Sequence, residues 1–246
     1  MTGHAPHAAR RYLFMEAFVP SLPRSFTTDR KILLVVGHYG SGKTNVAVNL
    51  ALAYAAAGEK TALADIDIVN PYFRAADDVR ELEEAGVLCV MPEFANTNLD
   101  IPSLPAALSS LCDGTVRAIL DAGGDEDGAA ALGGLRDRIA ATGYEMLFVI
   151  NACRPLTATP TEARELPREI EARCGLSATC VVDNTNLGDE TDQSLLFSSE
   201  AYARETAALC GLPLAFRSVL HTVPFPDDGR LFRMRQMTKR AFDLRS

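Results

Sequence analysis

Residues 37–44 have the residue types and spacing of a loop that binds phosphate groups. Their sequence, Gly-His-Tyr-Gly-Ser-Gly-Lys-Thr, fits the pattern G-x-x-x-x-G-K-[ST] and lies between an apolar run and an alanine-rich segment. The glycines let backbone N–H groups turn inward around phosphate oxygens, because no Cβ stands in the way. We therefore expect Lys43 to neutralise charge between the β- and γ-phosphates of a nucleotide, and Thr44 to offer its hydroxyl to Mg²⁺. An ordinary glycine-rich turn is the alternative interpretation.

Three aspartates at the ends of apolar runs are the expected partners of that magnesium ion. Mg²⁺ keeps most of its water and takes few protein ligands, which are usually carboxylates. Asp121 ends one run in the manner of a Walker B aspartate, and a Gly-Gly pair follows one residue later. Asp65 and Asp67 follow another run and face the same side of an extended chain. One of this pair could hold a magnesium-bound water while the other orients the attacking water; a helix cap or turn is the alternative for each aspartate.

The elements that must position these residues alternate along the chain from residue 31. Apolar runs predict strands at residues 31–36, 60–65, 87–91, 116–121, 146–151, 178–183 and 214–219. Helical spacing predicts helices at residues 45–57, 74–85, 104–112, 161–174 and 189–209. The alternation predicts an α/β fold, with a mostly parallel sheet flanked by helices on both faces and ligand bound beyond the carboxyl ends of the strands. We expect a single domain over residues 31–246 and a flexible N-terminal extension over residues 1–30.

The composition is that of a globular protein with a core of normal size. The chain has 246 residues, of which 48% are hydrophobic, and a net charge of −8. This acidic balance argues against broad nucleic-acid binding, and the absence of a run of about eighteen apolar residues argues against stable membrane insertion. Six scattered cysteines without a C-x-x-C pair are typical of reduced, buried thiols, so we expect a cytoplasmic protein.

Together these segments resemble the MinD/ParA/CobQ group of P-loop ATPases, within the wider SIMIBI class that includes signal-recognition and nickel-insertion GTPases. The resemblance rests on residues 37–44, on Asp-Ile-Asp-Ile-Val-Asn-Pro at 65–71 and on Asp-Ala-Gly-Gly at 121–124. It extends more weakly to residues 149–151, 182–184 and 223–224. It implies ATP and Mg²⁺ as ligands, and a mostly parallel sheet flanked by helices.

The resemblance also implies roles for single residues. In such a protein Asp65 and Asp121 would lie near magnesium, and Asp67 would position water. Asn184 would read the adenine, and a loop containing Val223 and Pro224 would pack on the base. The residues expected to contact the nucleotide are then Gly37, His38, Tyr39, Gly40, Ser41, Gly42, Lys43, Thr44, Asn45, Asn184 and Pro224.

Two departures from related sequences qualify this interpretation. Many MinD/ParA members carry a second lysine just after the first glycine of the loop, which reaches the partner's nucleotide across a dimer; here that residue is His38. The guanine-reading N-K-x-D signature is also absent, since Thr185, Asn186 and Leu187 follow Asn184. The missing signature favours ATP. The missing lysine weakens the case for cross-dimer activation, and a nucleotide-dependent homodimer remains one possible partner arrangement.

The C-terminal region carries a basic amphipathic pattern. Its members are Arg230, Leu231, Arg233, Met234, Arg235, Met237, Lys239, Arg240, Ala241 and Phe242. The pattern predicts a final helix packed on the sheet, with a helix lying on a membrane surface as the alternative.

The favoured function is a Mg²⁺-dependent, slow ATPase that acts as a nucleotide-driven switch on a protein partner, with metallocofactor maturation as one setting. One alternative is an ATP-dependent ligase or kinase of the dethiobiotin synthetase type, with residues 96–105 lining its pocket. A GTPase metallochaperone and a nucleotide-binding module without turnover are the others.

Overall fold

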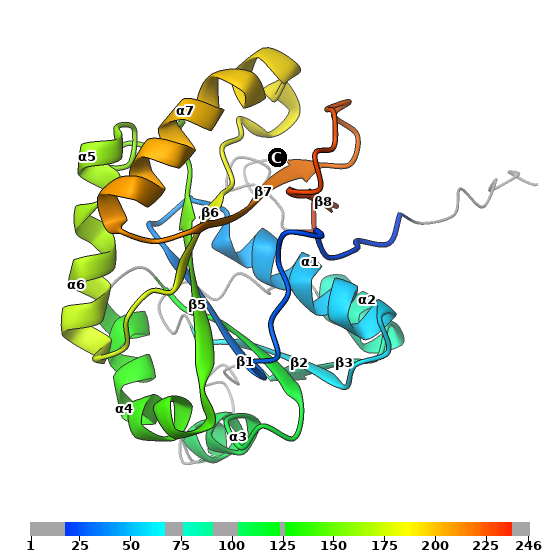
Figure 1. The fold of residues 1–246 in the computed structure, drawn as a ribbon. Helices are drawn as coiled ribbons and strands as arrows, with labels where there is room; N and C mark the ends of the chain where they lie inside the picture. Colours follow the sequence, from blue (N-terminus) through cyan, green and yellow to red (C-terminus); the bar gives the residue numbers. More distant parts are fainter. Residues whose placement is uncertain (1–17, 67–75, 91–102, 124–125, 238–246) are drawn as a thin grey trace, which may run out of the picture.

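The computed structural model describes residues 18–66, 76–90, 103–123 and 126–237, and it places eight parallel strands in one sheet (Figure 1). The strands are β1 (Ile32–Gly37), β2 (Thr61–Asp65), β3 (Val87–Val90), β4 (Arg117–Asp121), β5 (Tyr144–Ile150), β6 (Cys180–Asp183), β7 (Leu214–Leu220) and β8 (Leu231–Met234). Their order across the sheet is β3-β2-β4-β1-β5-β6-β7-β8. The helices are α1 (Lys43–Ala56), α2 (Ala76–Glu84), α3 (Ser103–Leu111), α4 (Glu126–Thr142), α5 (Pro160–Ala163), α6 (Glu165–Cys174) and α7 (Gln193–Cys210).

Helices cover both faces of this sheet, which confirms the predicted three-layer α/β/α fold. Alternate residues of β1 belong to two different cores: Ile32 and Leu34 pack with residues of α3, α4, α6 and α7, whereas Leu33 packs with α1 and α2. Every residue of β1 is buried. A strand buried on both faces reads as a continuous apolar run, and that is the signal by which the sequence predicts it.

The C-terminal residues 231–234 form strand β8, so the prediction of a helix there is wrong. They pair in parallel with β7, from Arg217 opposite Leu231 to Leu220 opposite Met234. Phe232 is buried against the ring of Phe216 at a centroid distance of 5.4 Å. Apolar residues of the C-terminal amphipathic pattern therefore belong to a strand at the edge of the sheet, and not to one face of a helix. Residues 238–246, which complete the predicted helix, lie outside the described part of the chain.

The segment after β8 is fastened to helix α1 by two buried asparagines. The Asn49 side chain accepts a hydrogen bond from the Arg235 N–H (2.8 Å) and donates one to the Arg235 carbonyl (3.0 Å). One turn earlier in α1, the Asn45 side chain accepts a hydrogen bond from the Met237 N–H (2.8 Å). The helix that begins at the predicted phosphate loop therefore also holds the end of the described chain.

Residues 18–30 pack on the sheet, although we expected residues 1–30 to lie outside the fold. Phe26 is buried edge-on against Phe216, with ring centroids 5.3 Å apart. The Ser25 hydroxyl donates to the Ala215 carbonyl (2.8 Å), and Phe18 stacks on His221. The expected boundary at residue 30 is therefore wrong for this segment, while residues 1–17 lie outside the described chain.

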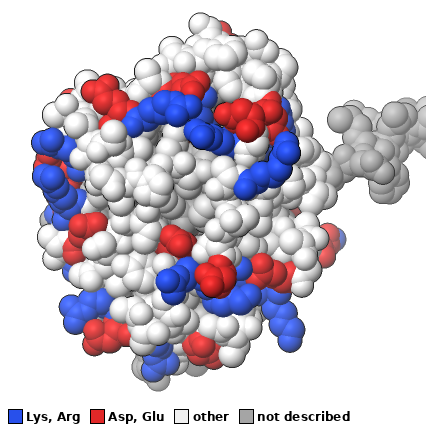
Figure 2. Space-filling model, viewed as in Figure 1, with Lys and Arg blue, Asp and Glu red and all other residues white. Residues whose placement is uncertain are grey.

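The surface carries charges of both signs. On the face shown in Figure 2, Lys and Arg lie next to Asp and Glu in most places, and the middle of the face is largely uncharged. Among the described helices, none combines the length and the apolar character that crossing a membrane requires.

Candidate functional site

The loop between β1 and α1 has the backbone shape that its glycines permit. Gly40 and Gly42 have φ angles of +77° and +84°, in the left-handed region that favours glycine. A Cβ on Gly37 would lie 2.5 Å from the Val149 carbonyl oxygen, so only glycine fits there. Helix α1 begins at Lys43, directly after the loop, and its first N–H groups and positive dipole end can receive an anion. The sequence prediction of a strand, a glycine-rich loop and a helix in this order is confirmed.

A cavity of about 560 Å³ opens beside this loop. One part of its wall is formed by Tyr39, Gly40, Gly42, Lys43, Thr44 and Asn45. Residues 184–188, 190 and 191 after β6, together with the ends of β7 and β8, contribute most of the remainder. This volume lies in the range of sites for small molecules and cofactors. The structure thus joins the predicted phosphate loop to a space in which the rest of a nucleotide can lie.

Four of the residues predicted to contact the nucleotide do not line this cavity: Gly37, His38, Ser41 and Pro224. Gly37 ends strand β1, and the buried Ser41 donates its N–H to the His38 carbonyl (3.0 Å). His38 Nδ1 lies 2.9 Å from the Tyr39 carbonyl oxygen. Pro224, which we expected to pack on the base, is exposed, and its carbonyl accepts a hydrogen bond from the Gln193 side chain (2.5 Å). The expected packing of Pro224 on the base therefore stays a prediction.

Asn184 lines the cavity and contacts the phosphate loop directly. Its Nδ2 donates to the Ser41 carbonyl (2.7 Å), and its Oδ1 accepts from the Ser218 hydroxyl (2.6 Å). Both ends of the amide are therefore bonded to protein in this structure. The amide keeps a second N–H donor and a second acceptor lone pair, and its predicted reading of adenine stays a prediction.

Asp65 and Asp121 lie side by side on neighbouring strands. They are directly paired in the register of β2 and β4, and Asp121 is also paired with Val35 of β1, the strand that leads into the loop. Each aspartate is only 1% exposed. Two adjacent buried carboxylates repel each other, and a divalent cation with hard oxygen ligands relieves that repulsion. These residues therefore fit Mg²⁺, whereas Asp67, the third predicted carboxylate, lies outside the described residues.

Within the described chain, His, Cys, Asp and Glu form no group of three or more that could hold a metal ion by themselves. Mg²⁺ does not need such a group, because it is usually bound by one or two carboxylates together with phosphates and water. The chemistry of the aspartate pair thus suits a metal that arrives with a phosphate ligand.

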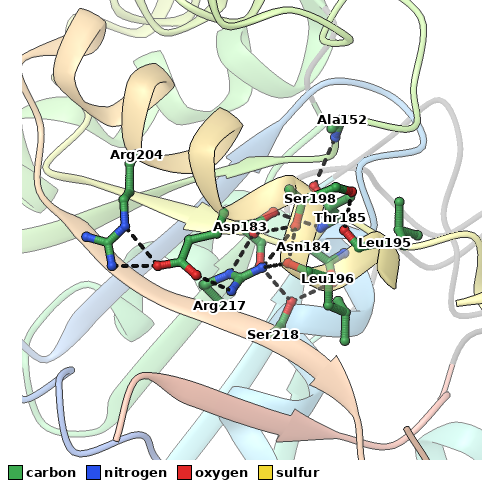
Figure 3. Close-up of polar contacts among 12 residues, drawn as sticks. Ala152, Asp183, Asn184, Thr185, Leu195, Leu196, Ser198, Arg204, Arg217 and Ser218 are labelled. Atoms are coloured by element: carbon green, nitrogen blue, oxygen red, sulfur yellow. Dashed lines mark hydrogen bonds and ion pairs between the residues drawn. The ribbon is translucent and has the colours of Figure 1, made fainter. Parts of the chain in front are cut away.

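A buried ion pair fixes the segment that carries Asn184 (Figure 3). Arg217 of β7 donates from Nε to Asp183 Oδ2 at 3.0 Å, and its guanidinium also bonds Ser199 and the Leu196 carbonyl. Asp183 Oδ1 accepts from the Thr185 N–H (3.0 Å). The sequence analysis did not predict this pair. The lone arginine inside the apolar run 214–219 is a signal from which a buried, paired charge could have been predicted.

The loop after β5 contributes a second cation, Arg154, which sequence reasoning also missed. Its Nε donates to the Gly40 carbonyl at 2.9 Å, and its side chain lines the cavity. The neighbouring Cys153 is half-buried, and burial raises the pKa of its thiol, so that it is a neutral thiol at physiological pH. The basic group of this loop, and not its thiol, is the one suited to an anionic ligand.

Comparison with known proteins bears on the fold. No family model and no curated protein matches the sequence. The fold is similar to chloroplast FtsY from Physcomitrella patens, with 16% identity and a TM-score of 0.53, over 85% of this chain and 66% of that chain. It is also similar to the signal recognition particle 54 kDa protein from Aeropyrum pernix K1, solved in complex with GDP, with 17% identity and a TM-score of 0.50, over 80% of this chain and 43% of that chain.

The chain thus spans less than two thirds of the length of either protein. At these identities the likeness concerns the fold alone, and a specific relation to the MinD/ParA group is not shown. The chain has the three-layer α/β/α fold found in P-loop nucleoside triphosphatases.

Proposed function

We propose that this chain binds a Mg²⁺–nucleoside triphosphate and hydrolyses it slowly, as a switch that acts on a protein partner. The observation that carries the proposal is the loop with left-handed Gly40 and Gly42, which leads into the buried Lys43 beside a cavity of about 560 Å³. The aspartate pair on β2 and β4 supports the metal. We expect the protein to act in the cytoplasm.

Each group of the site has one task in this proposal. N–H groups at the start of α1 receive phosphate oxygens, and Lys43 neutralises part of their charge. Thr44, Asp65 and Asp121 would hold Mg²⁺, which supplies charge neutralisation on the phosphates when bound. Asp67 orients a water toward the terminal phosphorus. Attack by that water breaks the bond to the bridging oxygen and releases phosphate and a nucleoside diphosphate.

ATP is the proposed triphosphate, because the sequence lacks the guanine-reading signature. One observation favours GTP as a second candidate: Glu190 lines the cavity, and a carboxylate can accept hydrogen bonds from the N–H donors of guanine. A role for GTP would make the GTPase metallochaperone the second candidate function. Within the described residues, no contact specifically supports the ligase or kinase alternative, and residues 91–102 lie outside them.

Exposed apolar side chains near the cavity support a partner that responds to nucleotide. Tyr39 is 58% exposed and Leu187 is 44% exposed, and both line the cavity. Leu156, in the loop that presents Arg154, is 67% exposed. A protein surface that covers these side chains would also close over a bound nucleotide; the partner could be another protein or a second copy of this chain.

Isothermal titration of the wild type with MgATP and MgGTP tests the proposal, with Lys43→Ala as the variant. We expect the wild type to bind MgATP more tightly than MgGTP, and Lys43→Ala to lose most of this affinity. Undiminished binding by Lys43→Ala would refute the proposed site. Asp67→Ala should keep the affinity and lose hydrolysis, and equal turnover of both proteins would remove Asp67 from the mechanism.

A further inference from the structure

Arg154 reaches the phosphate loop from a neighbouring strand. It follows β5, and its Nε donates to the Gly40 carbonyl at 2.9 Å. Among the described residues that line the cavity, Lys43 and Arg154 are the cations. Arg154 forms no ion pair with any carboxylate in the part of the chain that the structure describes, and this includes Glu190, which lines the same cavity. No acidic side chain among these described residues therefore neutralises its positive charge.

The loop that carries Arg154 is held firmly by its own hydrogen bonds. The Asn151 side chain accepts from the Cys153 N–H (2.9 Å), and the Asn151 carbonyl accepts from the Arg154 N–H (3.1 Å). The same carbonyl accepts from the hydroxyl of the fully buried Thr157 (2.9 Å). Tyr202 of α7 donates to the Thr157 carbonyl (2.6 Å). These bonds fix the backbone on both sides of Arg154.

The same loop contains a strained residue. Leu156 has a φ angle of +66°, and it is the one non-glycine with positive φ among the described residues. An L-residue adopts this conformation at an energetic cost, which persists only where the surrounding structure over-determines it. The loop therefore keeps one defined shape and presents Arg154 in a preorganised position beside Gly40.

We propose that Arg154 is a second phosphate-binding cation, supplied by the same chain, which donates hydrogen bonds to the phosphate chain of the bound nucleoside triphosphate. The inference rests on the proposed function. A guanidinium carries five N–H donors, and the bond from Nε to Gly40 leaves the donors of its two terminal nitrogens for a ligand. Planar guanidinium groups are well suited to phosphate oxygens, because they can form paired, charge-assisted hydrogen bonds.

A purely structural role for Arg154 would produce different behaviour. A side chain that only braces Gly40 would affect the stability of the loop, and its charge would not enter the binding equilibrium. A side chain that contacts phosphate would instead change both the affinity for nucleotide and its dependence on salt, since each cation that meets a polyanion adds to that dependence. Salt dependence therefore separates the two roles.

The experiment compares Arg154→Met and Arg154→Lys with the wild type by isothermal titration, using whichever of MgATP and MgGTP the wild type binds. We expect Arg154→Met to raise the Kd roughly ten- to a hundredfold and to flatten its dependence on salt. Arg154→Lys should recover part of the affinity and most of the salt dependence, because it keeps the charge. The control is Arg168→Met, which removes an exposed guanidinium 3.6 Å from Glu165 and should change neither quantity.

Two results would overturn the proposal: a Kd for Arg154→Met within about twofold of the wild type, or weaker binding with an unchanged salt dependence. Thermal unfolding without nucleotide shows that each variant is folded. If the wild type binds neither nucleotide, the proposed function itself fails. If the wild type binds, Lys43→Ala does not, and Arg154→Met binds normally, the inference about Arg154 alone fails.

Discussion

The Nδ2 atom of Asn184 donates a hydrogen bond to the carbonyl oxygen of Ser41 at 2.7 Å, and this bond connects the loop after β6 with the phosphate loop after β1. The contact depends on the missing side chain of the next residue, because a Cβ on Gly42 would lie 2.3 Å from the same nitrogen. Two walls of the cavity are therefore joined at a point where any residue other than glycine would force them apart.

Replacing Gly42 should consequently be more damaging than replacing a glycine of similar backbone shape elsewhere. Gly42→Ala introduces the clash with Asn184 and a strained left-handed alanine at a φ of +84°, and the strain alone costs about 1–2 kcal/mol. Gly58→Ala is the matched control, since Gly58 has a φ of +85° and nothing lies within 4 Å of its added Cβ. Thermal unfolding should show a loss of stability from backbone strain in both variants and a further loss from the clash in Gly42→Ala. Nucleotide titration should show a loss of binding only for Gly42→Ala. Equal binding by the two variants would argue against a coupling between the walls.

Asn184→Ala should weaken binding of ATP and GTP by the same factor. The substitution removes the donor to the Ser41 carbonyl, and leaving a buried group of this kind unpaired costs about 1–3 kcal/mol. The Ser218 hydroxyl, which also loses a partner, can still donate to the Asp183 carbonyl. A side chain that links two loops positions the phosphate loop, and this loop binds the phosphates that ATP and GTP share. Titration with each nucleotide checks this, and a loss confined to ATP would instead support the reading of adenine by Asn184.

Removing Arg217 should cost far more stability than removing a surface arginine. Arg217→Met leaves Asp183 as a buried and uncompensated charge, for which the typical loss is ~3–5 kcal/mol. Arg204→Met breaks an exposed pair with Glu200 on α7 and should cost about 0–1 kcal/mol. Denaturant unfolding monitored by circular dichroism measures both values. Similar losses in the two variants would show that the Arg217–Asp183 pair does not stabilise the fold in solution.

Asp121→Asn should weaken magnesium-dependent nucleotide binding without unfolding the protein. The neutral side chain has nearly the same shape and lowers the negative charge beside Asp65 in the adjacent strand, so the variant should stay folded without nucleotide. The affinity for nucleotide should fall in the presence of Mg²⁺ and stay unchanged in EDTA. Titration under both conditions tests the role, and an equal loss in EDTA would count against a metal function for this carboxylate.

Local patterns in the sequence were sufficient to predict the fold and the phosphate loop. The first seven strands are short apolar runs, and the loop after β1 is marked by glycine, lysine and threonine at fixed spacing. Helix α4 was missed because Gly128, Gly133 and Gly134 weaken its helical signal, although Leu132 and Ile139 are buried under the sheet. Strand β8 was missed because four residues with an arginine among them carry too little periodicity.

The contacts that complete the site are not visible in any local pattern. Arg154 lies 114 residues from Gly40, and Arg217 lies 34 residues from Asp183. Pairs of this kind are specified by the order of the strands, which brings the loops after β1, β5 and β6 to the same edge of the sheet. A single sequence contains the residues of such pairs but does not indicate which of them meet.

The asparagines of α1 have a practical consequence for any shortened version of this protein. Asn45 and Asn49 bond the backbone of residues 235 and 237, and Asn45 lies only two residues beyond Lys43. A truncation that ends at Met234 would preserve every described strand but would remove the backbone partners of these two side chains. Recombinant versions meant for nucleotide-binding assays should therefore extend at least through Met237.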